Sequence, residues 1–245
     1  MQTAIHDPAA GALPFAAGSV ARTVEEAILS RRSLRAFKPD PVPRETVARI
    51  LALASRAPSG SNIQPWHAYV VGGAERDRLA RLMHDEYLRH GEEGWKREYD
   101  YYPPTWREPY LARRRKIGWD LYRLLGIGKG DRERTRAQHA RNFLFFDAPV
   151  GMVFTLERDL PVGAWLDTGM FLQNVMLAAR AFGLDTCPQA AIASAHAVLR
   201  RELATPEGEI VVCGMALGHA RADAAENGLV TEREPVTRFA RFFGL

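Results

Sequence analysis

The sequence predicts an α+β fold on the basis of three observations. The chain has 245 residues, of which 47% are hydrophobic and 25% charged, which suits one large domain that needs no disulfide or metal to fold. Apolar side chains indicate strands at residues 66–71, 148–156 and 209–217. Helical segments lie between them without the regular alternation of a doubly wound parallel sheet, so the predicted class is α+β.

The first ordered element is expected to be a short helix. Residues 1–20 are rich in Ala, Gly and Pro and are predicted to be a loose arm. Thr23 and Glu26 then form a capping box, in which the hydroxyl accepts from a helical N–H group and the carboxylate reaches back. This box predicts a helix over residues 24–30.

Two more helices and an unusual stretch follow. Pro43 suits the first turn of a helix that ends near residue 57, and another helix is predicted over 74–85. Residues 86–141 interleave aromatic and basic side chains without strand alternation, so we expect helices and irregular loop. We interpret them as an insertion or lid on a single domain spanning residues 21–245. Its aromatic and basic side chains include Trp95, Tyr99, Tyr101, Tyr102, Trp106, Arg107, Tyr110, Arg113, Arg114, Arg115, Lys116, Trp119 and Tyr122.

The last third of the chain is more apolar. Residues 167–182 predict an almost wholly apolar helix, with Gly183 as its C-terminal stop. A further helix is predicted over 192–203. The tail over 236–245 carries three phenylalanines, so we expect it to be buried, either on its own chain or on a partner. These are Phe239, Phe242 and Phe243.

Composition and missing motifs exclude several classes of protein. No apolar stretch is long enough for a membrane span, and the first residues lack the basic and apolar regions of a secretory signal. Two cysteines, Cys187 and Cys213, make no disulfide framework, so a cytoplasmic location is expected. No dinucleotide, Walker, HExxH, zinc-spaced or GxSxG motif is present, so we predict no metal site. The net charge of +4 and the pI of about 9.3 suit an ordinary soluble basic enzyme, and they also suit binding of an anionic ligand or a nucleic acid.

A cationic cluster ends the first predicted helix. Arg31, Arg32, Ser33 and Arg35 place three guanidinium groups and a hydroxyl within five residues. Their mutual repulsion is offset if an anion accepts their hydrogen bonds, and arginine suits phosphate oxygens. The alternative is a solvated basic helix end, where cations also complement the helix dipole.

A polar loop follows about 20 residues further on. In residues 57–66, two prolines fix the backbone, and Gly60 permits a tight or positive-φ turn. The Ser, Asn and Gln side chains supply both donors and acceptors, which can line the edge of a flat heteroaromatic ring. The alternative is an ordinary connection between a helix and a strand.

Together these two segments resemble the FMN-dependent nitroreductase family, whose signature pair is similar to RRSLRAF and APSGSNIQPW of this chain. The later order is also similar: an apolar helix, then CPQAA, a strand ending GMALG, and EREP. The resemblance covers residues 24–83 and 142–245 and leaves the segment 86–141 outside. His219 departs from it, because many relatives carry an aromatic residue there, which puts the exit from the last strand in doubt.

The resemblance implies a central, mostly antiparallel sheet flanked by helices, in an intertwined homodimer with FMN at the subunit interface. It implies that Arg31, Arg32, Ser33, Arg35 and Arg233 hold the FMN phosphate and ribityl chain. Residues of the polar loop, often from the partner subunit, would line the ring, and a backbone N–H group after the last apolar helix would lie near N5. These residues are Pro58, Ser59, Gly60, Asn62, Gln64, Pro188, Gln189, Ala190 and Ala191.

The implied activity is ping-pong transfer of electrons from NADH or NADPH through flavin N5 to nitroaromatic or quinone-like acceptors. The flavin and water can handle the protons, so no catalytic side chain is predicted. The segment 86–141 either covers the ring and selects a flat aromatic substrate, such as a carboxylated one, or merely packs on itself. Other chemistry on the same fold stays open: flavin reduction, reductive dehalogenation or oxygen-dependent flavin destruction. A basic nucleic-acid-binding protein is a remote alternative, disfavoured by the small charge excess and the lack of a binding motif.

Overall fold

Four strands form one antiparallel sheet at the centre of the molecule. The computed structural model describes residues 16–244, except for the side chains of residues 92–94, so most of the expected arm over 1–20 lies outside the described residues. The strands pair in the order β1-β2-β4-β3, and every pairing is antiparallel. The predicted α+β class is confirmed. The strands are β1 (His67–Gly72), β2 (Val150–Glu157), β3 (Asp185–Gln189) and β4 (Glu209–Gly218).

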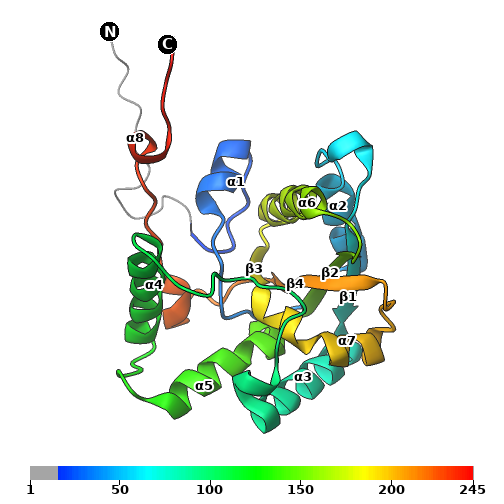
Figure 1. Ribbon diagram of the computed structural model, residues 1–245, viewed down its shortest axis with the longest axis vertical. Coiled ribbons are helices and arrows are strands. Elements are labelled where there is room, and N and C mark those ends of the chain that lie inside the picture. Colours follow the sequence, from blue (N-terminus) through cyan, green and yellow to red (C-terminus); the bar gives the residue numbers. More distant parts are fainter. Residues whose placement is uncertain (1–15, 245) are drawn as a thin grey trace.

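Helices cover both faces of the sheet (Figure 1). One layer contains α1 (Val24–Ser30), α2 (Arg44–Ala54) and α6 (Val162–Ala181). The other contains α3 (Gly73–Gly94), α5 (Arg132–Ala140) and α7 (His196–Leu203), while α4 (Tyr110–Leu124) stands beside the sheet. The shorter segments are η1 (Gly60–Asn62), η2 (Arg141–Asp147), η3 (Ala190–Ala195), η4 (Ala225–Gly228) and α8 (Val236–Phe239).

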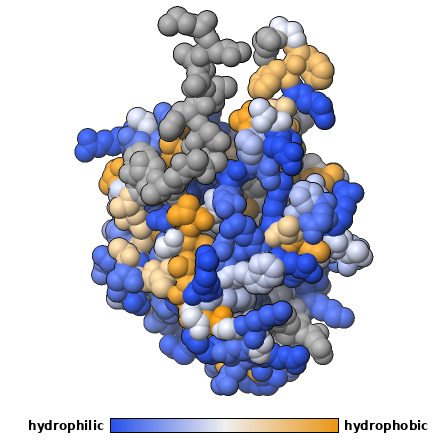
Figure 2. All heavy atoms as spheres, turned by 90° about the vertical axis from the view of Figure 1, so that its left-hand side faces the viewer, coloured by the Kyte–Doolittle hydropathy of each residue, from blue (hydrophilic) through white to orange (hydrophobic). Residues whose placement is uncertain are grey.

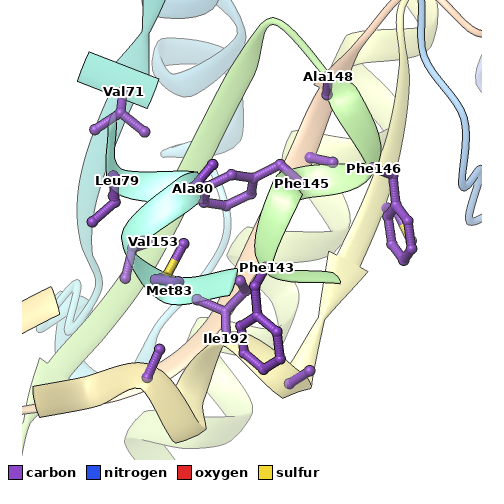
Figure 3. Close-up of a cluster of buried hydrophobic side chains, with 14 of the residues drawn as sticks. Val71, Leu79, Ala80, Met83, Phe143, Phe145, Phe146, Ala148, Val153 and Ile192 are labelled. Carbon is purple, nitrogen blue, oxygen red and sulfur yellow. The ribbon is translucent and has the colours of Figure 1, made fainter. Parts of the chain in front are cut away.

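Each face of the sheet has its own hydrophobic cluster. On the face of α3, the phenylalanines of η2 lie against the strands, with Phe143 and Phe145 fully buried (Figure 3). Two strand glycines make this packing possible. A Cβ on Gly151 would lie 2.7 Å from the ring of Phe145, and one on Gly214 would lie 2.6 Å from the side chain of Ile192.

A buried ion pair connects the end of α6 to the start of β3, beside α1. Arg180 and Asp185 are each 1% exposed, and their side chains meet at 2.6 Å. Arg180 also donates from Nε to the Ser30 hydroxyl at 3.0 Å and from Nη2 to the Ser19 carbonyl at 2.7 Å. Because a lone buried charge costs several kcal/mol, this network ties α1 firmly to α6 and β3.

The long apolar helix was predicted with the right end and a late beginning. Gly183 has a φ of +68° directly after α6, as expected for a helix stop. The helix begins at Val162, however, rather than at Asp167. In this chain Val162 and Leu166 are 83% and 69% exposed, so the first turn lacks the buried apolar pattern that marks the rest.

The strand β3 was not predicted. It has five residues and contains Pro188, both of which weaken a strand signal in a sequence. In the sheet its strand partner is β4, and it lies at the edge, where a proline without an N–H group is tolerated. Residues 190–195 then form the 3₁₀ segment η3, whereas one continuous helix was predicted from residue 192.

The C-terminal tail is not buried on its own chain. Beyond α8 it projects from the body of the molecule, at the top of Figures 1 and 2. Phe239, Phe242 and Phe243 are 71%, 61% and 84% exposed, so the expectation that the tail is buried on its own chain is wrong.

None of the helices in the described residues combines the length and apolar character that crossing a membrane requires.

Candidate functional site

The cationic segment, residues 31–35, follows α1 and runs beside β3. The Leu34 N–H group donates to the Thr186 carbonyl at 3.1 Å, and Ser33 pairs with Thr186 as an isolated parallel bridge. The buried Asn227 holds the same segment from the other side, because its Oδ1 accepts from the Arg35 N–H group at 2.7 Å. Its amide nitrogen donates to the Ala36 carbonyl, also at 2.7 Å. These contacts fix the backbone of the segment.

The structure brings Arg233 near enough to Arg31 to act on it electrostatically, although the two lie far apart in the sequence. Burial lowers the pKa of Arg31, and the charge of Arg233 lowers it further. Among the described residues, Arg32 donates to the Asn227 carbonyl and Arg35 to the Ser33 carbonyl. Within the described part of the chain, none of these four guanidinium groups lies within 4.0 Å of a carboxylate. Such uncompensated charge is stabilised by a bound anion.

The position of Arg233 depends on its two acidic neighbours. Glu232 pairs with Lys116 at 3.3 Å, and Glu234 pairs with Arg113 at 2.7 Å. Both cations belong to α4, so this helix holds the C-terminal segment on either side of Arg233. Helix α4 belongs to the segment 86–141, which therefore contributes to the geometry of the cationic cluster.

The strand β3 leads from the cationic cluster to the polar backbone of η3. Arg35 and Arg31 both act electrostatically on Cys187, whose pKa is raised to about 11 by burial. Ala190 lies three residues further on, about 10 Å along the strand direction. Next to it, the buried Gln189 donates from Nε2 to the Asn142 carbonyl at 2.7 Å, while its Oε1 has no donor among the described residues. The strand β3 thus has the cationic cluster near Cys187 and an unused hydrogen-bond acceptor at Gln189.

The polar loop is fastened to the first half of α6. Gly60 donates its N–H group to the buried carboxylate of Asp167 at 3.0 Å. The Gln64 N–H group donates to the Ser59 hydroxyl at 3.0 Å, and the Gln64 side chain donates to the Asn62 carbonyl at 3.2 Å. The tight turn expected at Gly60 forms, because the Gly60 carbonyl accepts from the Ile63 N–H group at 3.1 Å. A positive φ is not found at Gly60. It occurs at three non-glycine residues, Ser61, Asn62 and Gln64, with values of 50°, 58° and 49°.

Within one chain the loop and the cationic segment do not meet. The loop is held at Asp167, and the end of α1 is held at Arg180, which lies 13 residues later on α6. That separation is about 20 Å along the helix axis. Figure 1 shows α1 and the cyan segment after α2 on either side of α6. The side chains of Asn62 and Gln64 are exposed, so they are available to another molecule.

One group among the described residues could hold a metal ion at a different place. Ligand atoms of His67, Glu157 and Glu209 all lie within 4.8 Å of one another. The buried Glu209 carboxylate, however, already accepts hydrogen bonds from the hydroxyl groups of Tyr69 and Thr155. The group lies at the start of β4, beyond the part that pairs with β3. We assign no metal to it.

Comparisons with known proteins agree with the fold and with the sequence motifs. The family model described as the nitroreductase family matches residues 28–219. A 4-nitrobenzoate reductase of Nocardioides sp. strain LMS-CY is 39% identical over 94% of this chain and 94% of its own. A chloronitrobenzene nitroreductase of Comamonas testosteroni is 41% identical over 89% of this chain and 96% of its own. The chain therefore belongs to the nitroreductase family, as the resemblance predicted.

A solved structure is similar over almost the same extent. The FMN and NADPH-dependent nitroreductase NfnB from Sphigopyxis sp. strain HMH superposes with a TM-score of 0.87 at 37% identity. The match covers 91% of this chain and all of that chain. The unmatched part of this chain is shorter than the segment 86–141, so at least part of this segment has a counterpart in that structure.

Proposed function

We propose that this chain is an FMN-dependent oxidoreductase that uses NADH or NADPH to reduce nitroaromatic acceptors. The observation that carries the proposal is the cluster formed by the guanidinium groups of residues 31, 32, 35 and 233. None of them forms an ion pair with a carboxylate of the described residues. The named activities of the relatives support it: nitrobenzoate and chloronitrobenzene reduction in two of them, and FMN and NADPH dependence in the solved structure.

The residues present fit an FMN. The partly buried Arg31 beside Arg233 suits a phosphate, whose charge would relieve their repulsion. The unused acceptor of Gln189 suits a hydroxyl or ring N–H donor further along the same strand. We therefore assign Arg31, Arg32, Ser33, Arg35 and Arg233 to the phosphate and ribityl end, and Pro188 to Ala191 to the ring end.

A bound FMN would supply the redox chemistry, which is acceptance of a hydride from the nicotinamide and transfer of electrons to an acceptor. The chain itself binds and orients the participants. Arg31 and Arg233 neutralise the anionic end, and the backbone of β3 and η3 sets the direction of the ring. No side chain is assigned as an acid or base, because ordering the donor and the acceptor at one site is the principal task of the protein here.

The complete site requires a second copy of the chain. Pro58, Ser59, Gly60, Asn62 and Gln64 lie about 20 Å along α6 from the attachment of the cationic segment, so a partner subunit's loop would complete the ring end. A homodimer would also cover the exposed phenylalanines of the tail, since obligate interfaces are as apolar as a core. Two buried free cysteines suit a reducing cytoplasm.

The visible spectrum of the purified protein tests this function. Flavin absorption is expected, as is its loss on anaerobic addition of NADH or NADPH and its return on addition of nitrobenzene. Comparison of the two nucleotides identifies the donor. A colourless protein that takes up no added FMN would refute the cofactor, and flavin bands that neither nucleotide bleaches would refute the activity.

A further inference from the structure

The segment over residues 95–116 concentrates the positive charge of the chain. It contains seven Lys and Arg residues and three Asp and Glu residues, a difference of +4, which equals the net charge of all 245 residues. Its aromatic side chains are interleaved with these cations. Tyr101 and Tyr102 are 51% and 49% exposed, so the segment presents both kinds of side chain at the surface.

This segment lies against the ring end of the proposed site. Arg97 donates from Nε to the Ala190 carbonyl at 3.1 Å, which places its guanidinium group beside η3. The Tyr99 hydroxyl donates to the Val212 carbonyl, on the part of β4 that β3 does not cover. Figure 1 shows the green chain between α3 and α4 passing across this side of the sheet.

Two guanidinium groups of the segment share one aromatic ring. The Cζ atoms of Arg97 and Arg114 lie 6.0 Å and 5.9 Å from the centroid of the Tyr102 ring, and Arg114 lies 4.9 Å from the Trp106 ring. These are cation–π contacts, which fix the cations without neutralising them. Neither guanidinium group has a carboxylate within 4.0 Å among the described residues, whereas the neighbouring Arg113 is paired with Glu234.

We propose that Arg97 and Arg114 select acceptors that carry a carboxylate, so that the preferred substrate is a flat nitroarene carboxylate. Guanidinium groups bind carboxylates through two parallel hydrogen bonds, and the rings of Tyr102 and Trp106 offer flat surfaces to an aromatic ligand. This inference rests on the proposed function, because it requires that the acceptor lie beside Ala190. A purely structural role would use the same cation–π contacts only to hold the segment together.

The test compares kcat/KM for 4-nitrobenzoate and for nitrobenzene with the holoenzyme. In Arg114→Met the ratio of the two values is expected to fall about tenfold or more, mainly through KM, because a charged hydrogen bond is lost. Arg97→Met is expected to lower the same ratio, and Arg114→Lys to restore part of it. Arg115→Met is the matched control, since Arg115 lies on the same helix without a ring contact or ion pair among the described residues, and it should keep the ratio.

A change in the substrate tests the inference without any variant. The methyl ester of 4-nitrobenzoate has no charge, and the wild-type enzyme is expected to reduce it with a kcat/KM at least about tenfold lower than that of the acid. An ester that is reduced as well as the acid would overturn the inference, as would an unchanged ratio in both methionine variants. An equal fall in Arg115→Met would also overturn it. If the wild type reduces neither nitrobenzene nor the acid, the proposed function itself fails.

Discussion

At the scale of single residues, the cationic cluster differs from the buried ion pair of the fold. Arg31 is partly buried beside Arg233, and both burial and this neighbouring charge lower its pKa. Elsewhere the fold treats buried charge differently, since Arg180 is paired with Asp185 at 2.6 Å. An arginine held near another cation without a carboxylate is the arrangement expected if a bound anion relieves the repulsion.

Arg31→Met is therefore predicted to separate stability from cofactor binding. The apoprotein should unfold at the same urea concentration as the wild type or at a higher one, because the apolar stem is kept and the repulsion is removed. Its dissociation constant for FMN should rise by about tenfold or more. Urea unfolding of the apoprotein and fluorescence titration with FMN measure the two effects.

The matched control is Arg56→Met, which changes an exposed arginine that has no ion pair in the described part of the chain. It should alter neither quantity. A destabilised Arg31→Met apoprotein, or unchanged affinity for FMN, would show that this arginine serves the fold and not a ligand.

At the scale of elements, helix α6 positions the polar loop. Asp167 is 7% exposed and accepts from the Gly60 N–H group at 3.0 Å, and Trp66 stacks on Phe171 of the same helix with ring centroids 4.8 Å apart. The loop itself contains three non-glycine residues with positive φ, which is unfavourable unless contacts hold them. The bond from Asp167 is one of these contacts.

Asp167→Ala is predicted to lower the free energy of unfolding by about 1–3 kcal/mol, because the Gly60 N–H group loses its acceptor. The variant should also bind FMN more weakly. Asp167→Asn keeps an oxygen at this position and should lose much less on both measures. Equal losses in the two variants, in urea unfolding and in FMN titration, would show that the carboxylate charge and not the hydrogen bond is what matters.

The sequence predicted most elements because their signals are local. The Thr23 hydroxyl caps α1, and Gly183 follows the end of α6, as expected, whereas the Glu26 carboxylate accepts from the Arg22 N–H group. The strand β3 was missed, since its pairing with β4 is not local and Pro188 weakens its signal. The contacts of the site were hidden for the same reason: the approach of Arg233 to Arg31 depends on packing between distant segments.

At the scale of the whole molecule, the two signature segments lie on different parts of one chain. The sequence motifs suggested a single site, and the structure separates their attachments on α6 by about 20 Å. The same chain exposes Phe239, Phe242 and Phe243, and leaves Val162 and Leu166 uncovered at the start of α6. All these features are explained if two chains complete each other's sites.

Mixing two defective variants tests this claim most directly. One chain carries Arg31→Ala with Arg35→Ala, and the other carries Asn62→Gly with Gln64→Gly, where glycine suits the positive φ. Each variant alone should fail to retain FMN. Heterodimers purified through two different tags should bind FMN at one of their two sites, because that site combines an intact cationic segment with an intact partner loop. Heterodimers without flavin would contradict the account, since that is the result expected if each site lies within a single chain.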